Sequence, residues 1–324
     1  MKKSFLGKTT ALTGVVACLA AHSGWGQIPF ADNFDAGTSA SAWTAVLSHA
    51  DAFADFAFNY GTLGIPSAPN STGGSTVGLR FLANQSAGVQ QGISASPNGQ
   101  SFIGDFRLEF DMWLNYTGPL NGGGAGSTEV GSFGWGTSGA AAQWAGSSSS
   151  IMFGATGDGG SSFDYRVYRN NGLLAPASGV YAAGITTSPE VRDAGNAFYT
   201  SKFGGETAPT GQVTLFPGQT GATLAGTLGF KWRDVIVEKV GSVLTWKVDG
   251  YTLATADSAG ATLSGNNIFL GLFDINASSS PDANDFLVNA IYDNVRVTAV
   301  PEPSTVALAI CGGLGSLLAR RRRP

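Results

Sequence analysis

Hydrophobic and polar residues alternate along several short stretches of this chain. Residues 106–114 give the clearest case, with every second residue apolar and Arg107, Glu109, Asp111 and Trp113 on the other face. Because successive side chains of a strand point to opposite faces, this segment predicts a strand with one face toward a core. No stretch repeats its apolar residues with the 3.6-residue period of an amphipathic helix. The pattern therefore favours an all-β fold.

Turn residues separate further short strands. The predicted strands cover residues 163–169, 235–239, 243–248, 251–255, 268–273 and 290–297. Asn171-Gly172 and Asp249-Gly250 are typical hairpin turns between such strands. Short strands separated by turn residues predict a β-sandwich. The Gly/Ser-rich stretches 121–128 and 145–162 are interpreted as loops, because strand patterns resume on either side, and residues 27–299 are expected to form one domain.

The N-terminus has the pattern of a secretory signal peptide. Residues 1–26 contain Lys2, Lys3 and Lys8, then an apolar stretch, then small residues before Gln27. The apolar stretch is too short for a stable membrane span. A buried N-terminal helix and lipidation at Cys18 are the alternatives.

The C-terminal residues 300–324 contain three parts in order. A Pro-Glu-Pro triplet precedes an apolar segment over 305–319, and an arginine cluster ends the chain. As a helix, this segment would span roughly 22 Å, which is marginal against a hydrocarbon core of about 30 Å. Arginines that follow an apolar segment stay on the cytoplasmic side of a membrane. The residues of the triplet and the cluster are Pro301, Glu302, Pro303, Arg320, Arg321, Arg322 and Arg323.

This three-part order resembles the PEP-CTERM sorting signal of Gram-negative bacteria. The resemblance implies removal of the leader by signal peptidase, a transient hold in the inner membrane and cleavage by an exosortase near the Pro-Glu-Pro triplet. It also implies delivery to the cell surface or extracellular matrix, in a setting that produces exopolysaccharide. An ordinary tail anchor is the alternative. The resemblance covers residues 300–324 and says nothing of what the domain does.

Composition excludes several classes of function. Residues 27–299 contain 11 basic and 21 acidic residues, a net charge of −10 against −4 for the whole chain. Such a domain is poorly suited to nucleic acid or anionic membranes. Cys18 and Cys311 lie in the two ends, so the domain has no disulfide and no cysteine nucleophile. His49, its single histidine, is expected in a solvated loop, which excludes histidine-rich metal sites.

The body of the chain resembles concanavalin A-like and laminin-G-like jelly rolls. Residues 231–257, KWRDVIVEKVGSVLTWKVDGYTLATAD, are similar to the tryptophan-led double hairpin of those domains. Residues 31–35 and 292–297 are similar to their first and last strands. The resemblance implies a jelly roll in which the terminal strands pair side by side. Trp246 shares a face with Leu244 and Val248 and is expected in the core.

This fold resemblance directs attention to one carboxylate pattern. Laminarinase-type glycoside hydrolases of this class carry E-x-D-x-(x)-E on one strand, which places the general acid and the nucleophile on the same face. Glu109 and Asp111 supply the first half, and residues 112–115 contain no second glutamate. The catalytic set is incomplete, and the chain is not expected to be an enzyme.

Sugar and calcium are the ligands that the residue types still allow. The candidate carbohydrate-binding residues are Arg107, Glu109, Asp111 and Trp113 on one strand, with Trp135 and Trp144 in Gly/Ser loops. As a platform for sugar, Trp113 would have to be exposed on the sheet face, and packing of the tryptophans against neighbouring strands or loops is the more common arrangement. Candidate Ca²⁺ ligands are Asp32, Asp35 and Asp293, or Asp282, Asn284 and Asp285 within one loop, with solvated turn carboxylates as the alternative.

Together these patterns predict an exported, non-enzymatic surface or matrix protein that binds or adheres to polysaccharide. A polysaccharide hydrolase with an unrecognised carboxylate pair and a purely structural matrix protein are the alternatives.

Overall fold

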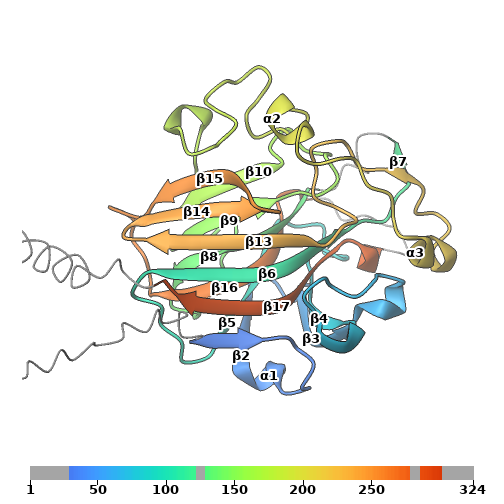
Figure 1. Ribbon diagram of the computed structural model, residues 1–324, viewed down its shortest axis with the longest axis horizontal. Helices are drawn as coiled ribbons and strands as arrows, with labels where there is room; N and C mark the ends of the chain where they lie inside the picture. The colour runs from blue at the N-terminus through green and yellow to red at the C-terminus, as the bar shows by residue number, and fades with distance from the viewer. Residues whose placement is uncertain (1–28, 122–127, 278–284, 301–324) are drawn as a thin grey trace, which may run out of the picture.

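The computed structural model describes residues 29–121, 128–277 and 285–300, which build two antiparallel sheets (Figure 1). Sheet A has the order β15 (Tyr251–Asp257), β14 (Val243–Val248), β13 (Arg233–Val240), β6 (Phe106–Asn115), β17 (Asn289–Ala299), β4 (Val77–Leu82), β3 (Phe53–Asn59), and β1 (Phe30–Asp32) pairs with β17. Sheet B has the order β11 (Gly172–Leu173), β10 (Tyr165–Arg169), β9 (Ile151–Ala155), β8 (Glu129–Thr137), β16 (Asn267–Asp274), β5 (Gln91–Pro97), β2 (Trp43–Leu47).

Short elements connect the strands. β7 (Leu120–Asn121) and β12 (Gly221–Ala222) form a small parallel pair. The helices are α1 (Ser39–Ala42), α2 (Ala197–Thr200) and α3 (Thr210–Leu215), with 3-10 turns at Tyr60–Leu63, Thr72–Gly74, Pro176–Ser178 and Asp285–Leu287. The prediction of an all-β sandwich is confirmed.

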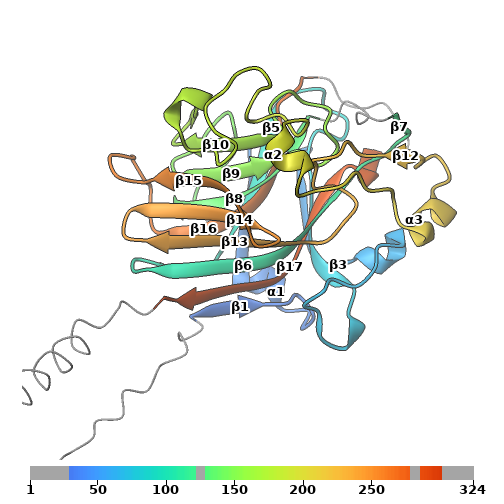
Figure 2. The ribbon, with the colours of Figure 1, turned by 45° about the horizontal axis from the view of Figure 1, so that its top comes forward.

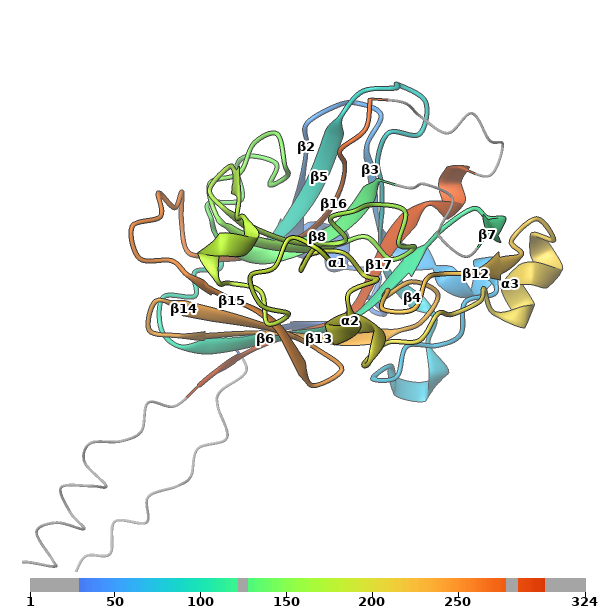
Figure 3. The ribbon, with the colours of Figure 1, turned by 90° about the horizontal axis from the view of Figure 1, so that it is seen from above.

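The core lies between the two sheets, which Figure 3 shows from above. The alternate residues of β6, namely Phe106, Leu108, Phe110, Met112 and Leu114, are each at most 3% exposed, as their pattern predicted. The Phe110 ring packs edge-on against Phe133 of sheet B, with centroids 5.0 Å apart. Trp246 is fully buried and its ring lies 5.5 Å from the same phenylalanine, which confirms its predicted place in the core.

The first and last strands of the sandwich lie side by side, as predicted. β1 runs antiparallel to β17, with Phe30 opposite Val297 and Asp32 opposite Val295. β1 therefore begins, and β17 ends, at the same end of the sandwich (Figure 2). The other half of β17 pairs with β4, and its whole length borders β6.

Sheet B contains strands that the alternation did not reveal. The stretch 145–162, expected to be a loop, contains β9, whose five residues are all buried. β9 lies between β8 and β10 and is covered on both faces, so its sequence is continuously apolar or small. Glycines in β8 permit a close approach between these strands. A Cβ atom on Gly134 would lie 2.0 Å from the carbonyl oxygen of Ile151.

The predicted signal peptide and sorting tail lie outside the described residues, as does most of the stretch 121–128. Within the part of the chain that the structure describes, no helix is long and apolar enough to cross a membrane.

Candidate functional site

A groove of about 760 Å³ lies on the outer face of sheet A, the face turned away from sheet B. Strands β13, β6 and β17 contribute Asp234, Glu109, Asn294 and Arg296 to its lining. The β1–α1 segment contributes seven residues between Ala31 and Ala42, and Asn70 comes from the long connection between β3 and β4. Five separate parts of the sequence therefore meet at one polar surface.

Three aspartates stand in a row beside this groove. Asp111 of β6 lies directly opposite Asp234 of β13 on one side and Asp293 of β17 on the other. Cross-strand neighbours have Cβ atoms about 4.5–5.5 Å apart, so Asp111 is close to each of the other two, which lie on opposite sides of it. Burial raises the pKa of Asp293 to about 7, and the charge of Asp111 adds to this effect. Burial also raises the pKa of Asp111.

A β-bulge brings a second side chain of β17 to the same place. The register between β6 and β17 shifts between Asp293 and Arg296, and Asn294 has a left-handed backbone with φ of 53°. Asp293 and Asn294 both contact residues on the outer face, while Val295 is buried. Bulges re-aim side chains in this way beside functional sites.

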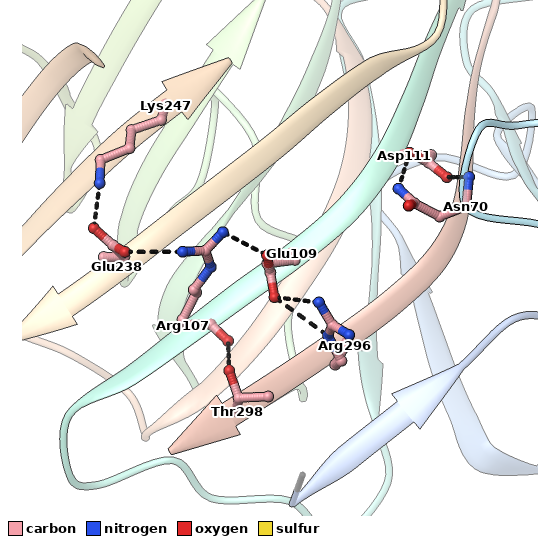
Figure 4. A network of polar contacts seen from close by, with 8 residues as sticks. All are labelled: Asn70, Arg107, Glu109, Asp111, Glu238, Lys247, Arg296 and Thr298. Carbon is pink, nitrogen blue, oxygen red and sulfur yellow. Dashed lines mark hydrogen bonds and ion pairs between the residues drawn. The ribbon is translucent and has the colours of Figure 1, made fainter. Parts of the chain in front are cut away.

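Asp111 lies beneath the groove and fixes two amide side chains. It is fully buried, and its oxygens accept hydrogen bonds from Asn70 Nδ2 at 2.9 Å and from Asn294 Nδ2 at 2.8 Å. It also accepts from the backbone N–H of Asn70 (Figure 4). Because an ionised carboxylate only accepts hydrogen bonds, both amides must turn their NH₂ groups toward it. Within the described residues, neither Asn70 Oδ1 nor Asn294 Oδ1 accepts a hydrogen bond, so both remain available.

Five charges of alternating sign run across the outer face next to the groove (Figure 4). Lys247 contacts Glu238, whose other oxygen lies 3.4 Å from Arg107. Arg107 Nη2 lies 2.6 Å from Glu109 Oε1, and Arg296 Nη2 lies 2.7 Å from Glu109 Oε2. We call this row, from Lys247 to Arg296, the charge ladder. Both oxygens of Glu109 are therefore held by guanidinium groups.

Asp234 differs from the other carboxylates of the groove. Its backbone N–H donates to Asp249, but among the described residues its carboxylate has no hydrogen bond and no ion pair. Burial raises the pKa of Asp234, and the charges of Glu109 and Asp111 raise it further. The side chain is thus an open hydrogen-bond acceptor in the groove lining.

The three predicted calcium ligands are each engaged by separate donors. Asp32 accepts from Phe34 N–H, Ser39 Oγ and Trp43 Nε1 at 2.8–2.9 Å. Asp35 contacts Ser75 Oγ and accepts from Asn33.

Asp293 accepts from Tyr60 and Ser71, each at 2.9 Å. Among the described residues, no three acidic, histidine or cysteine side chains are placed to hold a metal ion. The predicted grouping of Asp32, Asp35 and Asp293 is therefore not formed. Of the alternative set, Asp282 and Asn284 lie outside the described residues.

Trp113 is packed rather than exposed, so it offers no platform for sugar. Its side chain is on the outer face but is only 1% exposed, and its ring lies 5.6 Å from that of Trp232. Trp232 is in turn held by a 2.7 Å hydrogen bond from its Nε1 to the Pro66 carbonyl. The connection between β3 and β4 thus covers this end of the sheet, which the sequence pattern of one strand could not indicate.

The other candidate tryptophans lie elsewhere. Trp135 is in β8 rather than in a loop, is 5% exposed, and donates from Nε1 to the carbonyls of Phe102 and Asn266. Trp144 is in a loop, as predicted, but packs closely over Gly92 of sheet B. Of the six candidate carbohydrate-binding residues, only Glu109 lines the groove, where it binds Arg107, and Asp111 lies beneath it. His49 is exposed, as predicted.

Sequence reasoning did not identify Asn70, Asp234, Asn294 and Arg296. Asp234 occurs in the jelly-roll segment 231–257, and Asn294 and Arg296 occur in the segment 292–297, so the polar face of those strands was the available signal. Asn70 had none, because it lies in an irregular connection.

No family model matches the chain, and no curated protein matches it in sequence. Several solved structures are similar to it in fold. A Bacillus subtilis protein of unknown function with a galectin-like fold is 7% identical, with 84% of this chain and 96% of that chain covered and a TM-score of 0.40. The Ca²⁺-bound exoplasmic/lumenal domain of VIP36 is 10% identical, with 80% and 87% covered and a TM-score of 0.39. A structure described with endo-acting O-glycanases of the human gut microbiota is 13% identical, with 85% and 100% covered and a TM-score of 0.42. The two-sheet sandwich is established by the strand pairing itself, and these likenesses say nothing of the groove.

Proposed function

We propose that this protein is an exported, non-enzymatic surface or matrix protein that binds polysaccharide in the groove of sheet A. The observation that carries the proposal is the convergence of open acceptors in one cavity. Its lining includes Asn70, Asn294 and Asp234, whose amide oxygens and carboxylate accept no hydrogen bond among the described residues. A volume of about 760 Å³ lies within the range of small-ligand sites. Sugar hydroxyls are the donors that such planar acceptors bind.

The carboxylates of the groove support binding better than catalysis. Glycoside hydrolysis requires one carboxyl group to deliver a proton and a second to act as base or nucleophile. Both oxygens of Glu109 are held by arginines. Asp111 lies below Asn70 and Asn294. Asp234 therefore has no second open carboxylate beside it among the described residues.

One observation favours the hydrolase alternative. Asp234 is unpartnered and its pKa is raised, which are the properties of a general acid. Sugar release from the bound polymer, lost in Asp234→Asn, would favour this alternative. A polymer that binds but is not shortened favours the binding protein.

Delivery to the cell surface rests on the two ends of the sequence. The leader and the tail support export, processing by signal peptidase and an exosortase, and a transient hold in the inner membrane. The sandwich is compatible with both cleavages, because every strand that the structure describes lies between Phe30 and Ala299. The net charge of −10 for residues 27–299 argues against nucleic acid as a partner.

Calorimetry with the exported protein tests the proposal. We expect saturable binding to the producer's own exopolysaccharide, and weaker binding by Asp234→Asn. The matched control is Asp257→Asn on the exposed edge strand β15, which makes the same chemical change away from the groove. Absence of binding to any glycan would leave the purely structural role. Equal affinities for Asp234→Asn and Asp257→Asn would show that the glycan binds outside the groove.

A further inference from the structure

The groove presents acceptors and few donors. Asn70 and Asn294 direct their amide oxygens away from Asp111, and the Asp234 carboxylate is unpartnered. Among the described residues, the charged groups of the lining are three carboxylates and the guanidinium of Arg296. Arg296 uses Nε and Nη2 to bind Glu109, which also binds Arg107, so the charge of Arg296 is partly compensated.

From this arrangement we infer that the groove selects glycans that carry hydroxyl or ammonium groups, and discriminates against uronic acid and sulfated polymers. The inference rests on the proposed function and names its ligand class. An ammonium group would meet the Asp234 carboxylate, whereas a ligand carboxylate would meet Asp234 and the acidic groups next to it. Close like charges in a partly desolvated site cost far more than they do in water. The expected order of affinity is amino sugar polymer, then neutral polymer, then uronic acid polymer.

Asp111 is the positioning residue for this selectivity. It does not line the groove, yet it determines which atom of each amide faces the ligand. An asparagine at position 111 would offer one donor in place of one acceptor. An NH₂ group cannot face another NH₂ group without losing a hydrogen bond, so either Asn70 or Asn294 would have to rotate. The rotated side chain would then present a donor to the groove.

Matched oligomers of β-1,4-linked glucose, glucosamine and glucuronic acid test the inference with the exported protein by calorimetry. We expect glucosamine oligomers to bind at least about tenfold more tightly than glucuronic acid oligomers, with a ratio that falls as salt rises. In Asp234→Asn, the affinities for the glucosamine and glucose oligomers should become nearly equal. Asp257→Asn should leave all three affinities unchanged.

The Asp111→Asn variant separates positioning from simple structural support. If Asp111 had a structural role alone, the variant would lower the affinity for all three oligomers by the same factor. Positioning predicts that the ratio of glucose to glucuronic acid affinity falls severalfold. If this variant does not fold, amide hydrogen exchange in the unmodified protein replaces it. The side-chain NH₂ groups of Asn70 and Asn294 should exchange slowly, because both donate to a buried carboxylate.

Two results would overturn the inference while leaving the proposed function intact. One is binding of the glucuronic acid oligomer as tight as that of the glucose oligomer. The other is rapid exchange of both NH₂ groups. If no oligomer or polymer binds, the proposed function itself fails.

Discussion

Asp111 and Asp293 lie directly opposite each other on β6 and β17 and hold consecutive residues of one loop. Asp111 accepts from Asn70, and Asp293 accepts from Ser71. Two neighbouring buried carboxylates thus tie the connection between β3 and β4 to the face of sheet A. This connection supplies one lining residue of the groove and covers Trp113, so its attachment shapes the site.

The paired carboxylates predict that stability falls between acid and neutral pH. The pKa of Asp293 is about 7 in the folded protein against a usual value of 3.8, so the folded state holds a proton that the unfolded state has lost. Unfolding free energy should therefore decrease as pH rises through this window, by on the order of 2 kcal/mol. Urea denaturation at about pH 5 and about pH 8 measures it.

Asp293→Asn is the test variant for this pH dependence, because asparagine fits the same space without titrating. In this variant, part of the decrease in unfolding free energy with rising pH should disappear. The remainder is expected from Asp164, whose pKa burial also raises to about 7. A slope unchanged in Asp293→Asn would show that this carboxyl group is not the source.

Removal of β17 and removal of β1 should have different consequences. β17 borders β6, β4 and β1, so deletion of residues 290–298 should abolish folding. β1 is a three-residue edge strand, and its loss mainly removes the hydrogen bonds to Asp32. We expect deletion through Asp32 to lower unfolding free energy by about 3 kcal/mol and to leave a folded protein. Thermal melting followed by circular dichroism distinguishes the two, and a normal melt without residues 290–298 would contradict the pairing.

Gly134 should not tolerate a side chain. A Cβ atom at this position would lie 2.0 Å from the carbonyl oxygen of Ile151, so Gly134→Ala must push β8 and β9 apart. The expected loss is about 3 kcal/mol, the upper part of the range for overpacking. Gly104→Ala is the control, since nothing lies within 4 Å of its Cβ position. Equal melting temperatures for the two variants would mean that the strands are farther apart than described.

A reducing agent should leave the melting temperature of the exported protein unchanged. Both cysteines, Cys18 and Cys311, lie in the segments predicted to be removed. The same preparation tests processing by intact-mass analysis. We expect a chain that begins near Gln27 and lacks Arg320–Arg323. A mass that includes residues 304–324 would exclude tail removal.

The sequence was informative where one face of a strand is buried and the other is polar. β6 is such a strand, and its alternation placed Phe110 in the core and Asp111 on the outer face correctly. β8 and β9 were not recognised because both of their faces are covered. Their glycines and serines serve close strand packing, and in the sequence this is hard to distinguish from a loop.

The site was less accessible to sequence analysis, because it depends on register. Glu109 and Asp111 were identified from one strand, but nothing in the sequence aligned Asp234 and Asp293 with Asp111. Asn70 reaches the groove through an irregular connection. The same connection buries Trp113, so this tryptophan is covered although it lies on the polar face of its strand.

The position of the groove on β17 has a mechanical consequence. Asn294 and Arg296 lie on the last strand, only a few residues before its end at Ala299. If the protein is held by its C-terminal end while a glycan is bound in the groove, tension would pass along the segment of β17 between Asn294 and Ala299. This piece of β17 lies between β6 and β1. The backbone hydrogen bonds to both neighbours run perpendicular to the strand, so they would be loaded together in shear. The remaining strands of the sandwich would carry little of the force.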